Sequence, residues 1–145
     1  MTTPHRATLI LVPYSIAALF AARRAIHLIW VGLALGNDGN PIRANVEMFA
    51  GQTVGTTTVE LSLQHDAAGS TRGWAIRRGT CARAGSVLGA QSAYAPLRVD
   101  SAGKASAKAN LALTLPDTGD YHVIIAPSAT ERRRMLACGN LVLED

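Results

Sequence analysis

The sequence predicts an all-β fold, a Greek-key β-sandwich of about seven or eight strands, preceded by a hydrophobic N-terminal helix. Beyond residue 40, apolar and polar residues alternate with a period of two in several short runs. Clusters rich in Gly, Asp, Ser and Pro separate these runs. Successive side chains of a strand point to opposite faces, so each run offers an apolar face to a core and a polar face to water. Short strands divided by frequent turns are typical of a sandwich.

The first element, residues 1–36, is hydrophobic and carries an arginine pair, Arg23 and Arg24. It has two interpretations. In one, the pair is the positive region of a signal peptide, residues 25–35 are its apolar core, and cleavage follows Gly36. In the other, the segment is retained as a membrane anchor. Its roughly thirty helical residues would span about 45 Å, which exceeds the ~30 Å hydrocarbon core of a bilayer.

The arginine pair favours an anchor that has protein neighbours. Near the middle of a lone membrane helix, each arginine costs about 2.5–3.5 kcal/mol. The cost falls if Arg23 and Arg24 meet partner groups in a complex or reach the headgroups. His27 and Trp30 would then lie near the membrane boundary, where amphipathic rings accumulate. A histidine in an apolar helix also binds the magnesium of pigments, but we favour the interfacial interpretation for His27.

Residues 37–42 contain a dense turn signal and predict a linker to an exported domain at 43–145. Asp100 to Gly103 predict a hairpin turn. The segment from Asp117 to Tyr121 resembles a tyrosine corner, in which a tyrosine hydroxyl bonds back to the backbone just upstream. The clearest alternating runs in the domain are 43–48, 59–64 and 104–113.

The charge distribution argues against a nucleic-acid partner. Of the 14 Lys and Arg residues, three precede Asp38, which leaves 11 against 10 Asp and Glu in the rest of the chain. The densest basic cluster, Arg132 to Arg134, lies in a loop-like stretch beside Glu131. Nucleic-acid binding needs basic residues concentrated on one face. We therefore expect no nucleic-acid partner.

The predicted domain has no recognisable enzyme motif. No serine lies in a G-x-S-x-G elbow, and neither a phosphate-binding loop nor a dinucleotide fingerprint is present. His65 and His122 are the only histidines of this domain, and we expect both to face solvent. A coincidental metal site between them is the weaker alternative. We expect no catalytic residue, no metal ligand and no cofactor.

Two segments carry a resemblance to a known family: Trp74 to Cys81 (WAIRRGTC) and Ala137 to Leu141 (ACGNL). They resemble exported bacterial β-sandwich proteins related to Cu/Zn superoxide dismutase and to the chordin-like (CHRD) domain. The family pattern is approximately W-H-V-H-x-G-T-C, and a further histidine follows a Y-x-V-x-x-H strand. The resemblance covers about residues 43–143. The three histidine positions fall on Ala75, Arg77 and Ala126.

The resemblance implies a retained scaffold whose metal ligands are lost. A methyl group cannot bind a metal, and a guanidinium stays protonated and repels a cation. The resemblance also implies that Cys81 and Cys138 form a disulfide, the alternative being two buried free thiols. Arg77, Arg78 and Arg83 would lie at the mouth of the former site. There they would either contact an anion or an acidic partner, or remain solvated.

These observations predict a non-catalytic, membrane-anchored structural or accessory subunit of a bacterial membrane or envelope complex. Its sandwich would lie in the periplasm, its anchor in the inner membrane, and its partners would be protein subunits and the lipid bilayer. Two alternatives remain open. One is a metal-binding protein of the superoxide dismutase type with a non-standard site. The other is a secreted, stand-alone binding module that is released by cleavage after Gly36.

Overall fold

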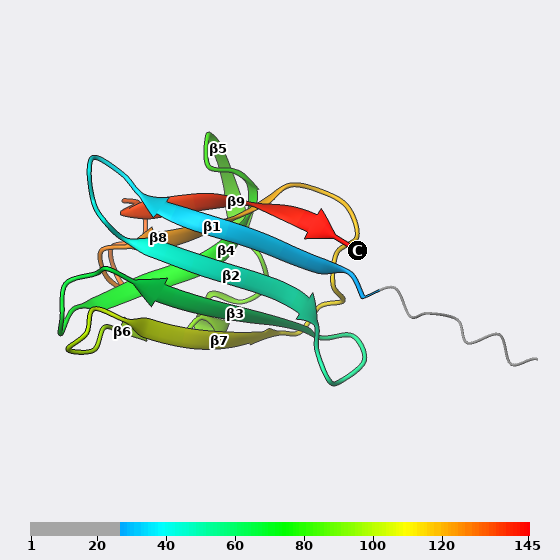
Figure 1. The fold of residues 1–145 in the computed structure, drawn as a ribbon. Helices are drawn as coiled ribbons and strands as arrows, with labels where there is room; N and C mark the ends of the chain where they lie inside the picture. The colour runs from blue at the N-terminus through cyan, green and yellow to red at the C-terminus, as the bar shows by residue number, and fades with distance from the viewer. Residues whose placement is uncertain (1–26) are drawn as a thin grey trace, which may run out of the picture.

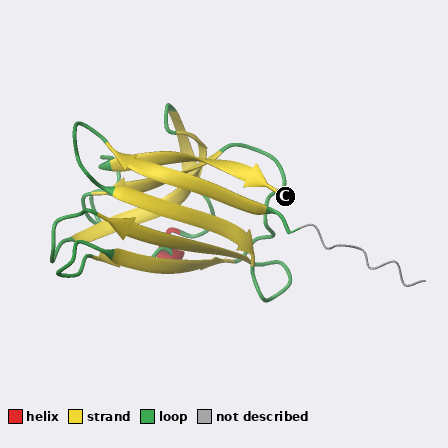
Figure 2. Cartoon of the chain, viewed as in Figure 1, coloured by secondary structure: helices red, strands yellow, loops and turns green. Residues whose placement is uncertain are grey.

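The computed structural model describes residues 27–145. This part of the chain is built from β-strands and one 3-10 helix, η1 (Gln91–Ala93), so the all-β prediction is confirmed (Figures 1 and 2). Nine strands are present in these residues, slightly more than the sequence predicted. The strands are β1 (Ile29–Gly36), β2 (Arg43–Ala50), β3 (Thr57–Gln64), β4 (Thr71–Thr80), β5 (Arg83–Val87), β6 (Leu97–Arg98), β7 (Ala105–Leu111), β8 (Tyr121–Ala126) and β9 (Ala137–Glu144).

All these strands belong to one antiparallel sheet with the order β5-β4-β8-β9-β1-β2-β3-β7, and β6 pairs with β4. The sheet curls over, so that β4 and β8 lie behind β1, β2 and β3 in a sandwich-like arrangement (Figure 1). The apolar residues of the two halves face one another across the interior. The inward residues of β2 and β3 illustrate the pattern, since Val46, Met48, Val59, Leu61 and Leu63 are all buried.

Strand β1 corrects the predicted N-terminal helix and the predicted domain boundary. Residues 29–36 are extended and form the centre of the sheet, paired with β2 from Ile29↔Phe49 to Leu35↔Arg43 and with β9 from Ile29↔Glu144 to Gly36↔Ala137. The helix was a wrong prediction here because an apolar run of this length fits either structure until its neighbours are known. The neighbouring strands β2 and β9 have backbone N–H and C=O groups that need hydrogen-bond partners, and residues 29–36 provide them as a strand.

Residues 37–42 are the turn between β1 and β2, not a linker between domains. The Gly36 amide donates to the Ile42 carbonyl at 2.9 Å, which closes the hairpin. Asp38 and Gly39 adopt positive φ values of 54° and 78°, so the Asp-Gly pair supplies the left-handed backbone that the turn needs. Arg23, Arg24 and the remainder of the expected helix lie outside the described residues.

Two tryptophans fix the interior of the sandwich. Trp30 is 4% exposed, donates from Nε1 to the Pro116 carbonyl at 2.8 Å and packs edge-on against Tyr121. Trp74 donates from Nε1 to the Ala95 carbonyl at 2.7 Å and packs against Tyr94 in the same way. The expectation that Trp30 contacts a membrane boundary is therefore wrong, because its ring belongs to the core.

The local motifs of the sequence are present only in part. The Asp100 amide donates to the Lys104 carbonyl at 2.8 Å, so the predicted turn forms. The strands on either side of it do not pair into a hairpin, because β6 pairs with β4 and β7 pairs with β3. The Tyr121 hydroxyl donates to the Thr118 carbonyl at 3.1 Å, as the tyrosine-corner interpretation requires. The turn and the tyrosine contact are local in the sequence, whereas the choice of strand partners is not.

Candidate functional site

Ala75, Arg77 and Ala126, the positions that the sequence resemblance compares with metal-binding histidines, lie on one face of strands β4 and β8. Ala75 and Arg77 alternate with the inward-facing Trp74 and Ile76, so they occupy the outer face of the sheet. Ala126, on β8, lies opposite Gly73 in the register. Both alanines are nevertheless buried, with exposed fractions of 2% and 0%.

A loop after β8 covers this outer face at Gly73. A Cβ atom built at Gly73 would lie 2.5 Å from the Ser128 carbonyl oxygen and 3.2 Å from the Ala129 Cα. The loop therefore crosses the end of the face where Gly73 lies opposite Ala126 in the register.

His122 corrects the prediction of a solvent-facing imidazole, because it is fully buried on β8. Its Nδ1 lies 2.9 Å from the Gly79 carbonyl oxygen. A carbonyl only accepts, so Nδ1 carries a proton and donates it to this oxygen. The Nε2 atom has no hydrogen-bond partner, and neither does Nε of Arg77, the residue opposite His122 in the register. His65 is exposed in the turn after β3, so the two histidines form no common site.

The hairpin between β4 and β5 explains the burial of His122. Cys81 in this hairpin forms a disulfide with Cys138 of β9, with a Cα–Cα distance of 6.0 Å, so the predicted disulfide is confirmed. The Cys81 amide also donates to Oδ1 of Asn140 at 2.8 Å. These two links hold the hairpin across the outer face of β8, directly over the imidazole.

The predicted arginine cluster does not form as one group. Arg77 is half-buried on the outer face, whereas Arg78 pairs in the register with Tyr121, whose ring packs against the core residue Trp30. Neighbouring residues of a strand point to opposite faces, so Arg77 and Arg78 diverge. Arg83 is exposed on β5. The outer face of β4 and β8 therefore offers no joint basic surface of Arg77, Arg78 and Arg83 for an anion.

A different surface stands out at the middle of the sheet. Leu33, Leu35 and Val142 have exposed fractions of 37%, 50% and 61%. Val142 lies directly opposite the half-buried Val31 in the β1–β9 register. These four residues project from the outer face of two adjacent strands, and we call them the apolar strip. Contiguous exposed apolar side chains on a folded domain mark binding surfaces more often than isolated ones do.

Polar residues of β2 border the apolar strip in strict register. Arg43 lies opposite Leu35, Asn45 opposite Leu33, and Glu47 opposite Val31. All three polar side chains are exposed. An apolar centre with a polar border is the usual composition of a protein–protein interface.

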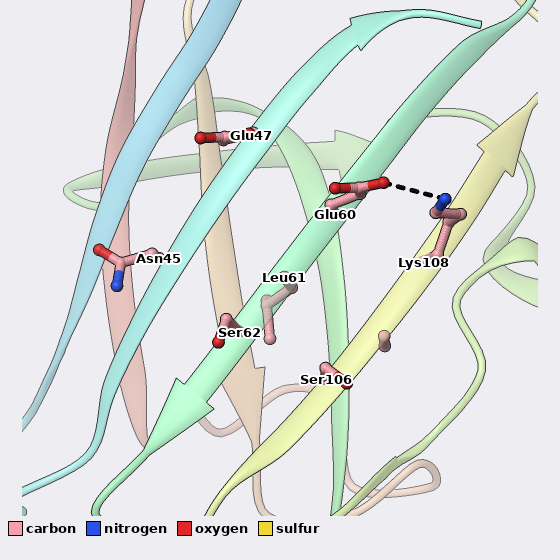
Figure 3. Close-up of a pocket in the computed structure, with 8 residues that line it drawn as sticks. Asn45, Glu47, Glu60, Leu61, Ser62, Ser106 and Lys108 are labelled. Carbon is pink, nitrogen blue, oxygen red and sulfur yellow. Dashed lines mark ion pairs between the residues drawn. The ribbon is translucent and has the colours of Figure 1, made fainter. Parts of the chain in front are cut away.

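Beyond β2, the outer face continues as a shallow polar groove across β3 and β7 (Figure 3). Glu47 lies opposite Glu60, which lies opposite Lys108. Lys108 Nζ approaches Oε1 of Glu60 at 2.9 Å, so this carboxylate is paired and Glu47 remains available to another cation. Asn45, Ser62 and Ser106 form the neighbouring row of the groove, as Figure 3 shows.

Sequence reasoning missed this surface because β1 was predicted to be helical. With a strand in its place, Val31, Leu33 and Leu35 would have been seen on one face at a spacing of two residues. From the sequence, the polar residues of β2 and β3 were predicted only to lie on the solvent-exposed faces of their strands. Their relation to the apolar strip depends on the pairing of β1 with β2, which a single sequence does not show.

No protein-family model matches this chain, and no curated protein matches it significantly. Within residues 27–145, no group of three or more His, Cys, Asp or Glu side chains is arranged to hold a metal ion. The part of the chain that the structure describes also holds no helix that is both long and apolar enough to cross a membrane.

Proposed function

We propose that this chain is a non-catalytic, membrane-anchored structural or accessory subunit of a bacterial membrane or envelope complex, and that its outer sheet face contacts protein partners. The apolar strip is the observation that supports this function best. Leu33, Leu35 and Val142 expose a large part of their surface on the central strands of an otherwise well-packed domain. A protein partner that covers them would remove this apolar surface from water, at about 25 cal/mol per Å².

The disulfide supports export to the periplasm. Disulfides persist in oxidising compartments and are rare in the bacterial cytoplasm. The Cys81–Cys138 bond joins segments 57 residues apart and fixes the hairpin over His122. An oxidising environment is therefore needed for the folded shape of the outer face.

The anchor of this proposal is shorter than the sequence first suggested. Because β1 begins at Ile29 and residues 27–28 are not helical, a membrane helix would have to lie within residues 7–26. These residues would span about 30 Å as a helix, which matches the ~30 Å of a hydrocarbon core. Arg23 and Arg24 would then lie near the periplasmic end of the helix, where they can reach headgroups or a partner subunit.

The residues at the former ligand positions support a non-catalytic role. Ala75 and Ala126 are buried and present methyl groups, and the Arg77 side chain carries a permanent positive charge. The proposed relationship to the superoxide dismutase-like and CHRD-like family would then be one of shared scaffold, Greek-key connections included, without the metal chemistry.

One observation favours a second candidate, a metal-binding protein with a non-standard site. The Nε2 atom of His122 is buried and has no hydrogen-bond partner, which leaves a lone pair available to a metal. Metal analysis of purified protein separates the two candidates. Stoichiometric copper or zinc that is lost in His122→Gln would establish the second candidate, whereas protein free of both metals would exclude it.

The proposed function is tested by extracting the protein from native membranes in mild detergent and measuring the mass and composition of the particle. We expect a stoichiometric complex with other membrane proteins. Leu33→Asp should release the chain from it, because the substitution places a charge in the apolar strip. Ala102→Asp is the matched control, since Ala102 is exposed in the turn between β6 and β7, away from the strip and from the start of β1. A wild-type chain that always extracts as a free monomer would overturn the proposal.

A further inference from the structure

We propose that one partner of the outer face is a second copy of this chain, packed face to face through β1 and β2 about a two-fold axis. The axis would cross the strands at the row of Leu33 and Asn45. This inference rests on the proposed function, because it identifies a partner for the surface described there. Most homo-oligomers are closed and two-fold symmetric, and such an interface requires a surface that complements itself.

The charges of β2 show this self-complementarity. The exposed side chains along the strand are Arg43, Asn45 and Glu47, one cation and one anion at equal distances on either side of a neutral amide. A two-fold axis that passes over Asn45, perpendicular to the strands, places Arg43 of one copy over Glu47 of the other. The same operation generates the reciprocal pair, so both charges of each copy find an opposite charge.

The apolar residues of β1 obey the same symmetry. Val31 and Leu35 lie two residues on either side of Leu33, on the same face. Across the axis Leu33 meets Leu33 of the other copy, and Val31 meets its Leu35. The register between β1 and β2 brings the two patterns together, because Leu33 lies opposite Asn45 and both rows share one centre. Apolar residues thus meet apolar ones, and each charge meets its opposite.

The twist of the sheet permits this contact near the axis. Aligned sheets pack with their strands about 30° apart and their faces about 10 Å apart. Arg43 and Glu47 lie about 7 Å from the axis, at about 3.4 Å per residue. A crossing angle of about 30° would offset the paired positions by about 3.5 Å, which long Arg and Glu side chains can span. Glu60 is already paired with Lys108 and does not compete for Arg43.

Charge-reversed variants of the full-length protein in mild detergent test the dimer, with sedimentation velocity as the readout. Arg43→Glu places a new carboxylate over Glu47 of the other copy, and Glu47→Arg places a new guanidinium over its Arg43. Each variant alone should therefore dissociate at about tenfold higher concentration than wild type. Arg98→Glu is the matched control, because Arg98 is exposed on β6 and outside this face. It should leave the dimer unchanged.

Mixing the two variants gives the decisive result. In a mixed pair, one copy carries carboxylates at both positions and the other carries guanidinium groups at both, so every contact is attractive. We expect the mixture to dimerise at least as tightly as wild type, although each component alone does not. A folding defect cannot produce this rescue. A wild-type protein that stays monomeric at high concentration, or a mixture that stays as weak as its components, would overturn the dimer.

A cysteine on the proposed axis provides an independent measurement in native membranes. Asn45→Cys should be crosslinked between two copies by a short bifunctional thiol reagent, because symmetry places the two thiols opposite each other across faces about 10 Å apart, which is beyond the reach of a direct disulfide. Asn110→Cys, exposed on β7 and far from the axis, should not. Equal crosslinking at both positions would contradict the geometry. A crosslinked dimer without any other subunit would support this inference and refute the larger complex, so the two proposals fail separately.

Discussion

His122 lies directly opposite Arg77 on strands β8 and β4, and each of the two side chains holds a buried nitrogen without a hydrogen-bond partner. The hairpin between β4 and β5 covers the pair, and the Cys81–Cys138 disulfide holds that hairpin in place. Two buried nitrogen atoms without hydrogen-bond partners at one place lower the stability of the fold there, since an unsatisfied buried group costs about 1–3 kcal/mol.

Arg77→Met should therefore leave the free energy of unfolding unchanged or raise it by up to about 1 kcal/mol, because it removes a buried donor that has no acceptor. His122→Phe should lower it by about 1–3 kcal/mol, because the Gly79 carbonyl loses its donor. Denaturant unfolding of both variants measures the difference. If Arg77→Met proved the more destabilising of the two, the description of its Nε as unpartnered would be wrong.

The disulfide should contribute substantially to stability. The cysteines are 57 residues apart, and closing a loop of about this length stabilises a domain by about 4 kcal/mol on the chain-entropy model. The double variant Cys81→Ala/Cys138→Ala should lower the free energy of unfolding by about this amount. Reduction of the native protein should add two hydrogens to its mass. Two thiols that alkylate freely in unreduced protein would contradict the bond.

The ion pair of Asp66 and Arg72 predicts a stability loss in acid. Burial by itself raises the pKa of the Asp66 carboxyl, but the side-chain bonds from Arg72 and the Ala67 amide bring it below its ordinary value of 3.8. Arg72 donates from Nε and Nη2 to the two carboxylate oxygens, each at 2.8 Å. The pKa of Asp66 is lower in the folded chain than in the unfolded chain. The ion pair therefore contributes its full share of the free energy of unfolding at pH values above the unfolded pKa. That share is lost as the pH falls through the folded pKa.

Asp66→Asn should therefore lower the free energy of unfolding at neutral pH by roughly 1.5–3 kcal/mol, the range for hydrogen bonds to charged groups. The variant and the wild type should converge as the pH falls through the folded pKa of Asp66, because the wild-type carboxyl is then protonated as well. Denaturant unfolding between pH 2 and pH 7 gives both curves. A difference that stays constant over this range would show that the pair does not titrate as described.

Strand β1 predicts where the mature protein begins. Cleavage after Gly36 would remove the strand that pairs with both β2 and β9, together with the core residue Trp30. We expect the first residue of the mature chain to be Leu28 or an earlier one, whether the N-terminal segment is retained or cut. Intact mass and N-terminal sequencing decide this. A folded mature protein that begins at Asn37 would contradict the central position of β1.

The sequence alone was sufficient to predict β2, β3 and β7. Each of these strands has one buried and one solvent-exposed face, so its apolar and polar residues alternate clearly. The sequence was misleading for β1, whose outward residues Leu33 and Leu35 are apolar like its inward ones. These outward apolar side chains prevented the strand from being predicted, and they are also what makes the outer face a candidate site. His122 was wrongly predicted to face solvent for another reason. The hairpin that contains Cys81 covers its side chain, and that contact exists only in the folded chain.

The central claim is that a protein partner covers the apolar strip in the cell. Single cysteines at Leu33, Leu35 and a control position, labelled in native membranes with a bulky, membrane-impermeant maleimide, test it most directly. The control is Ala102→Cys, because Ala102 is exposed in the turn between β6 and β7, at the end of the sandwich opposite the start of β1. We predict rapid labelling of Ala102→Cys, at least tenfold slower labelling of the two strip positions, and equal labelling of all three after denaturation. Equal rates at the strip and at Ala102 in native membranes would contradict the claim.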